Sequence, residues 1–83
     1  MTKFSLVILS KLNEFNVESA SKSLSISQIL DLIPEKQRKS YSTVYRHLSN
    51  VVSQGYVKCG LDDGLASTYY ITENGKLFCM SQN

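Results

Sequence analysis

The chain has 83 residues, of which 42% are hydrophobic and 19% are charged, and its formal net charge at pH 7 is +2. This length is near the lower limit for a domain that folds alone, so we expect residues 1–83 to form a single domain. Two cysteines and one histidine are too few for a structural zinc site, and no apolar run is long enough for a signal peptide or a membrane span, which predicts a cytoplasmic protein.

The first predicted element is a helix over residues 2–15. Thr2 can cap its N-terminus through the side-chain hydroxyl. We expect this helix to form the back of the core, although its apolar stripe would also suit a partner protein. The stripe recurs at helical spacing and consists of Phe4, Val7, Ile8, Leu12 and Phe15.

A short extended piece at residues 24–26 precedes the second predicted helix. Ser25 and Gln28 fit a capping box, in which each side chain bonds the backbone N–H of the other residue. Pro34 ends this helix, because the residue before a proline is pushed out of the α region. Residues 34–39 (PEKQRK) then form a basic turn.

The third predicted helix begins at Ser40 or Ser42 and ends at Gly55, a residue that adopts positive φ at low cost. One side of it is apolar, with Val44, Leu48 and Val51 flanked by Tyr41 and Val52. The other side is small or polar and includes Ser42, Thr43, Arg46, Ser49, Asn50 and Ser53.

The basic residues are concentrated around this helix. Between Lys36 and Lys58 there are five cations and no acidic residue, whereas the rest of the chain has four cations and seven acidic residues. A short polar face with one arginine, in the only positive region of the chain, is typical of a helix that enters a DNA groove.

The C-terminal third predicts a β-hairpin followed by a short helix. Strands are expected at residues 56–59 and 67–71, joined by an Asp-Gly turn at residues 61–65. Residues 72–76 open a last turn of helix, from which Leu77 and Phe78 are expected to pack on the core. Residues 80–83 are expected to fray. Cys59 and Cys79 are expected to be reduced, packed thiols, with a disulfide between them as the alternative.

Three segments resemble the winged helix-turn-helix family. Residues 24–30 (LSISQIL) resemble its first strand and second helix, and residues 42–48 (STVYRHL) with 54–57 (QGYV) resemble a signature of bacterial winged-helix repressors. Residues 69–76 (YYITENGK) are similar to the segment after the wing in PadR-like regulators. The resemblance implies an α+β winged helix with a three-helix core, a short first strand, a C-terminal β-hairpin wing and a short final helix, as in small regulators of the MarR/PadR-like kind.

The resemblance also implies a DNA-binding mode in which residues 40–54 are the recognition helix in the major groove. Base contacts would come from the polar face of this helix, with Arg46 suited to guanine and Asn50 to adenine. Phosphate contacts would come from the basic turn and the helix edge. The full set of predicted DNA-binding residues is Lys36, Arg38, Lys39, Ser42, Thr43, Tyr45, Arg46 and Asn50. His47 is either a core-margin residue or another phosphate contact.

The predicted wing tip departs from the family pattern. DNA-contacting wings usually carry Arg or Lys, but this one has Asp62 and Asp63 between two leucines. Phosphates would repel both carboxylates. The tip is therefore expected to be a solvated turn or to contact a protein partner.

Two functions remain open at this stage. The first is a sequence-specific double-stranded DNA-binding transcriptional regulator, such as a repressor, acting as a homodimer. The second is a winged-helix protein–protein interaction module, such as an adaptor or a phage- or plasmid-type inhibitor of a host complex. No nucleophile–base pair or acid–base carboxylate pair is recognisable, so we expect neither an enzyme nor a cofactor or metal.

Overall fold

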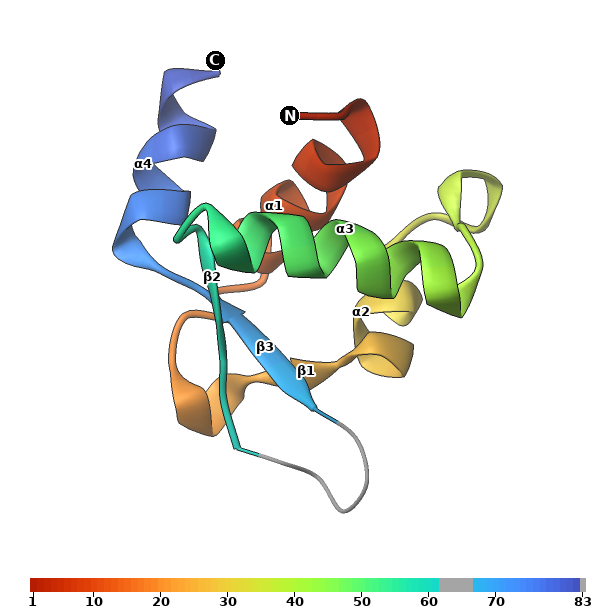
Figure 1. The fold of residues 1–83 in the computed structure, drawn as a ribbon, viewed down its shortest axis with the longest axis horizontal. Coiled ribbons are helices and arrows are strands. Elements are labelled where there is room, and N and C mark those ends of the chain that lie inside the picture. Colours follow the sequence, from red (N-terminus) through yellow and green to blue (C-terminus); the bar gives the residue numbers. More distant parts are fainter. Residues whose placement is uncertain (62–66, 83) are drawn as a thin grey trace.

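The computed structural model describes residues 1–61 and 67–82. Four α-helices and a small sheet alternate in the order α1 (Lys3–Glu14), β1 (Leu24–Ser25), α2 (Ile26–Leu32), α3 (Tyr41–Ser53), β2 (Val57–Cys59), β3 (Thr68–Ile71) and α4 (Glu73–Ser81). Single 3₁₀ turns lie at Ala20–Lys22 and Glu35–Gln37. The predicted α+β winged-helix architecture is confirmed (Figure 1).

The predicted helix ends are largely confirmed. Thr2 caps α1 by accepting from the N–H of Ser5, and the capping box of α2 is complete, with both the Ser25 and the Gln28 side chains bonded. Ser40, rather than Ser42, caps α3. Gly55 follows α3 with φ +82°, a conformation that favours glycine.

The sheet is antiparallel, with strand order β1-β3-β2. Val57 lies opposite Ile71 across the hairpin, and Leu24 lies opposite Tyr69 on the other edge of β3. Strand β3 is therefore central, which explains its burial. The predicted acidic turn at Asp62 and Asp63 lies outside the described residues, whereas both strands of the hairpin are confirmed.

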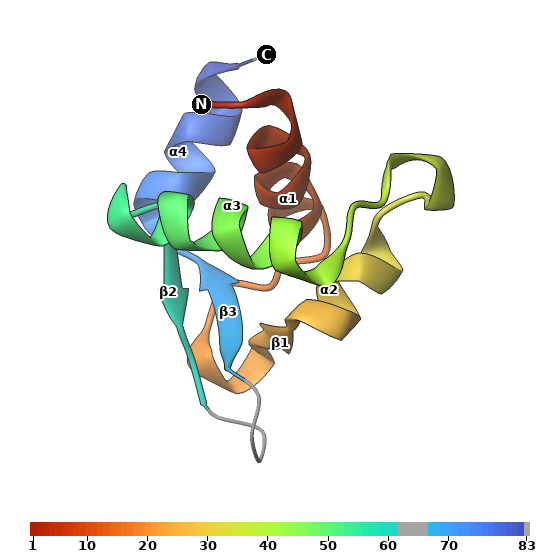
Figure 2. The same cartoon turned by 45° about the vertical axis from the view of Figure 1, so that its right-hand side comes forward.

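The core lies between α1, α2 and α3 and extends onto the inner face of the sheet (Figure 2). Alternation along β3 turns Tyr69 and Ile71 towards the helices, and both are at most 5% exposed. The most completely buried side chains come from α1, from α2 and its C-cap, from α3 and from both hairpin strands: Ile8, Leu9, Leu12, Ile29, Ile33, Val44, Leu48, Val51, Val57 and Ile71.

Four expectations about the chain are wrong. Phe15 follows α1 and is 54% exposed, because the helix ends one residue earlier. Leu77 is 53% exposed on the outer side of α4, and only Phe78 folds inward, where its ring stacks on Tyr56 with 4.8 Å between centroids. Helix α4 continues to Ser81 instead of fraying at residue 80. Cys79 is buried as expected, but Cys59 is exposed.

Residues 15–23, which connect α1 to β1, are held against the rest of the fold at Val17 and Glu18. The N–H of Ile71 donates to the carbonyl of Val17 at 2.8 Å, and Val17 itself is buried. Glu18 forms an ion pair with Lys76 of α4. The pair lowers the pKa of Glu18 and raises that of Lys76, mainly through their hydrogen bond.

Candidate nucleic-acid interface

Helix α3 has one buried and one exposed side. Val44, Leu48 and Val51 are fully buried against the other helices, which anchors the helix and fixes its rotation about its own axis. Ser42, Arg46, Ser49, Asn50 and Ser53 are exposed on the opposite side. Because most of these side chains are short, another molecule can approach the helix backbone closely.

Arg46 lies in the middle of this exposed side. Of residues 41–53, it alone carries a formal charge, and its side chain is exposed. Asn50 is one turn further along the helix and is exposed as well. The two side chains therefore present a guanidinium group and an amide group on the same surface.

Thr43 lies at the margin of the exposed side instead of its centre. It is only half-exposed, and its hydroxyl accepts a hydrogen bond from Ser40 at 2.9 Å. Its backbone N–H donates to the same Ser40 oxygen at 3.3 Å. Thr43 thus takes part in the N-cap of α3, which sequence spacing alone did not indicate.

Two tyrosines of α3 lie along the edge of the helix that is nearer the sheet. Tyr45 is 54% exposed, as its predicted role requires. Tyr41 is 56% exposed, whereas helical spacing predicts it on the apolar flank. Beneath them, burial raises the pKa of Tyr69, and the neighbouring Cys59, Tyr45 and Tyr41 add to that increase. Tyr41 is a candidate contact residue that its spacing one turn before Tyr45 could have revealed.

His47 lies on the opposite edge of α3 and contacts the first turn of α1 and its N-cap. Its Nδ1 lies 2.8 Å from the hydroxyl of Ser5 and 3.1 Å from that of Thr2. The ring also packs edge-on against Phe4, with 5.1 Å between centroids. The sequence predicts that His47 either lies at the margin of the core or contacts a phosphate. Its hydrogen-bond contacts through Nδ1 and its packing against Phe4 support the position at the margin of the core.

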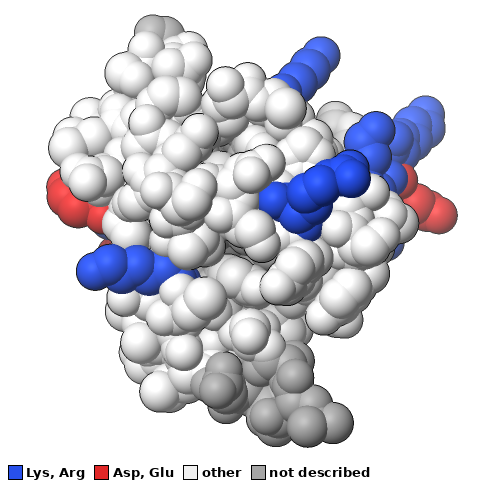
Figure 3. All heavy atoms as spheres, in the orientation of Figure 1, with Lys and Arg blue, Asp and Glu red and all other residues white. Residues whose placement is uncertain are grey.

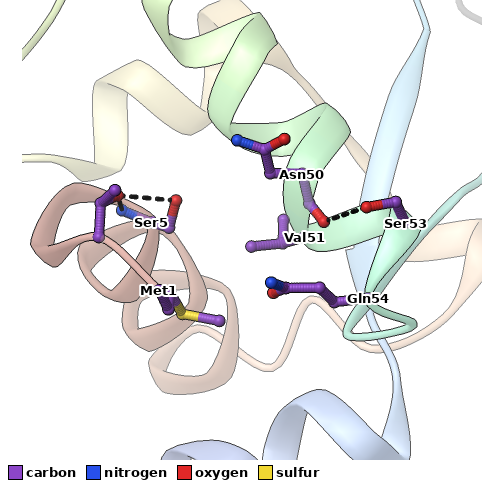
Figure 4. Close-up of a pocket in the computed structure, with 7 residues that line it drawn as sticks. Met1, Ser5, Asn50, Val51, Ser53 and Gln54 are labelled. Atoms are coloured by element: carbon purple, nitrogen blue, oxygen red, sulfur yellow. Dashed lines mark hydrogen bonds between the residues drawn. The ribbon is translucent and has the colours of Figure 1, made fainter.

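A shallow cavity of about 360 Å³ lies between the start of α1 and the C-terminal half of α3 (Figure 4). Asn50 and Ser53 of α3, with the following residue Gln54, line one side of it, and Met1 and Ser5 line the other side. Ser53 donates to the carbonyl of Asn50 at 2.7 Å. The cavity extends the polar surface of α3 towards the N-terminus.

The connection between α2 and α3 carries the predicted phosphate contacts. Lys36, Arg38 and Lys39 are all exposed, and Glu35 precedes them. Arg38 also donates from Nε to the carbonyl of Ile33 at 2.8 Å, which anchors the connection to the end of α2. In Figure 3 the basic side chains of this face lie over α3, this connection and the first turn of α1, with another beside β2, while acidic side chains lie at the margins.

The described residues do not form a recognisable catalytic or metal centre. Within residues 1–61 and 67–82, no group of three or more His, Cys, Asp or Glu side chains is placed to hold a metal ion. Ser5, which approaches His47, is only 2% exposed and so is closed to a substrate. In the same part of the chain, no helix has the length and apolar character needed to cross a membrane.

No protein-family model and no curated protein sequence matches this chain. Among solved structures, it is similar to the solution structure of the DNA-binding TubR fragment from Clostridium botulinum. The two chains are 29% identical, with a TM-score of 0.76, and the match covers 100% of this chain and 98% of that one. The likeness therefore includes α3 and its surroundings as well as the core.

Proposed function

We propose that residues 1–83 act as one winged-helix domain, a cytoplasmic transcriptional regulator that binds double-stranded DNA sequence-specifically through α3. The exposed side of α3, which has short polar side chains around Arg46 and basic residues at its N-terminal end, is the observation that carries this proposal. The likeness to a DNA-binding fragment over the whole chain supports it independently.

The proposed base contacts follow from the hydrogen-bonding groups of α3. Arg46 donates two hydrogen bonds to O6 and N7 of a guanine in the major groove, and Asn50 pairs with N6 and N7 of an adenine. Ser42 and Thr43 contribute hydroxyls near the N-terminus of the helix. These contacts give specificity, because each base pair shows a distinct donor and acceptor pattern in the major groove.

The proposed phosphate contacts border α3. Tyr45, and Tyr41 beside it, reach one backbone through their hydroxyls, and Lys36, Arg38 and Lys39 reach the other through their charges. Such contacts position the helix and make affinity depend on salt, because cations release counterions from DNA.

A homodimer is the proposed working form, since paired half-sites increase affinity and specificity. The exposed side of α4 is its proposed contact surface, because Leu77 and Met80 are 53% and 66% exposed on the same helix. Phe4 is only 9% exposed and Phe78 is half-buried against the core, so neither aromatic ring is assigned to this contact.

A binding titration on random and genomic double-stranded DNA at several salt concentrations tests the proposal. We expect affinity to fall steeply as salt rises, and a genomic fraction to be retained above the random background. Absence of binding at low salt would overturn the proposal.

The protein-interaction module is the second candidate. Leu61, which precedes the acidic residues Asp62 and Asp63, is 65% exposed, and an exposed leucine beside carboxylates would suit a protein surface better than a phosphate backbone. This function would be supported if the titration found no DNA binding and a partner protein were released by substitution of Leu61.

A further inference from the structure

The first turn of α1 and the connection between α2 and α3 enclose a groove of about 380 Å³. These two segments are about thirty residues apart in the sequence and line one groove only in the folded chain. Six residues line the groove: Lys3, Phe4, Val7, Lys36, Gln37 and Lys39.

The groove has a cationic rim. Three of its lining residues are lysines, and none is acidic. Within residues 1–61 and 67–82, the ion pairs are Lys11–Glu14 and Lys76–Glu18, so none of the three groove lysines is neutralised by a carboxylate there. Three like charges around one groove repel one another, and an anionic ligand would relieve that repulsion.

The floor of the groove is apolar. Phe4 and Val7 of α1 form it, and the ammonium group of Lys39 lies 6.0 Å from the centroid of the Phe4 ring. A ligand that fits must therefore combine an anionic group with an apolar body of a few carbon atoms. The sugar–phosphate backbone of DNA has both, because each phosphate is joined to a deoxyribose ring.

The groove also lies beside α3. The Phe4 ring packs against His47 of that helix, and Lys39 directly precedes its cap, Ser40. His47 follows Tyr45 by two residues, which places the two about 200° apart around the helix. The groove and the tyrosines therefore lie on opposite sides of α3, where the two backbones that border a major groove would run.

We propose that the groove formed by Lys3, Lys36 and Lys39 binds the sugar–phosphate backbone of the DNA strand on the α1 side of α3. The phosphate accepts hydrogen bonds from the lysines, and the deoxyribose packs on the half-exposed Val7 and on the small part of Phe4 that lines the groove. Lys3 thereby becomes a DNA contact that the sequence had not indicated. This inference rests on the proposed function of α3 as a DNA-binding helix.

Substitution of Lys3 tests the groove. The affinities of wild type, Lys3→Ala and Lys11→Ala for a random and a genomically selected duplex are measured by fluorescence anisotropy across a salt series. We expect Lys3→Ala to weaken both duplexes by the same factor and to reduce the slope of log K against log salt by about 0.9, the value for one phosphate contact. Lys11→Ala removes a lysine of the same helix outside the groove, and its slope should match that of wild type.

The possible outcomes separate this inference from the function on which it rests. If Lys3→Ala and Lys11→Ala behave alike while Arg46→Ala loses affinity for the selected duplex, the groove does not bind DNA, although α3 does. If wild type binds neither duplex, both proposals fail. Lys3 is exposed, and Lys11 is half-exposed and pairs only with the exposed Glu14 of the same helix, so both lysine variants should keep the wild-type circular dichroism spectrum.

Discussion

Side chains on the borders of α3 show what helical spacing can and cannot indicate. Spacing correctly divided Val44 and Leu48 from Arg46, because helix periodicity fixes opposite sides. The prediction misplaced Tyr41 on the apolar flank and Thr43 on the polar face, because both residues lie near the boundary between the two sides. Their exposure is decided by neighbours distant in sequence or by the cap, as the Ser40 hydrogen bond to Thr43 shows.

The two cysteines should differ in reactivity. Burial raises the pKa of the Cys79 thiol, which is 9% exposed, whereas Cys59 is exposed at the end of β2. Since the thiolate is the reactive form, we expect a thiol reagent at pH 8 to label only Cys59 in the native protein. In urea, both thiols should react.

Native labelling of a Cys59→Ser variant is the control for that experiment and should be close to zero. Equal labelling rates of the two thiols in native wild type would show that the packing of α4 is wrong.

At the scale of elements, local signals predicted where helices begin and end, and distant contacts decided the rest. The Ser25–Gln28 capping box and the glycine after α3 lie within a few residues of the features that they determine. The pairing of β1 with β3 depends on residues more than forty positions apart. The groove that brings Lys3 to Lys36 also depends on distant residues, which are 33 positions apart. The MarR/PadR-like subfamily stays a prediction.

Alanine should have different effects on stability at two neighbouring positions of α4, Asn74 and Gly75. A Cβ atom at Gly75 would overlap the carbonyl oxygen of Tyr56 and the side chain of Ile71. We therefore expect Gly75→Ala to lower the free energy of unfolding by about 1–3 kcal/mol, the usual cost of overpacking, although alanine normally favours a helix over glycine by about 1 kcal/mol.

Urea unfolding measures this effect, and Asn74→Ala is the matched control. Asn74 is exposed in the same turn of α4, so its replacement should leave stability equal or slightly higher. A Gly75→Ala variant as stable as wild type would contradict the close approach of α4 to Tyr56.

At the scale of the whole molecule, separate parts of the chain meet on two sides of α3. Helices α1 and α4 lie side by side and bring the two ends of the chain close together (Figures 1 and 2). The first turn of α1 also lies next to the α2–α3 connection, beside the exposed polar side of α3. Basic residues distant in sequence thus gather around α3. A modest net charge of +2 conceals this concentration.

The Glu18–Lys76 ion pair predicts a dependence of stability on pH. Because folding lowers the pKa of Glu18 and raises that of Lys76, the pair stabilises the fold between the two unfolded pKa values. Its contribution is lost as pH falls through the folded pKa of Glu18, or rises through that of Lys76. We expect the stability difference between wild type and Lys76→Gln to be present at pH 7 and to vanish as Glu18 becomes protonated.

Urea midpoints at pH 7 and in acid measure that difference. Lys58→Gln removes an exposed lysine of β2 and should show no comparable change with pH. A Lys76→Gln effect that persisted after Glu18 was protonated would mean that Lys76 stabilises the fold by packing rather than by its charge.

The central claim is that Arg46 contacts a guanine in the major groove, and methylation interference on a selected duplex tests it most directly. Methylation of guanine N7 blocks a major-groove acceptor. We predict that methylation of a contacted guanine prevents binding of wild type but has no effect on binding of Arg46→Ala. The preference of Arg46→Ala for the selected duplex over a random duplex should also be about 1–3 kcal/mol smaller than that of wild type. The same interference pattern for both proteins, or none at any guanine, would contradict the assignment of α3 as the recognition helix.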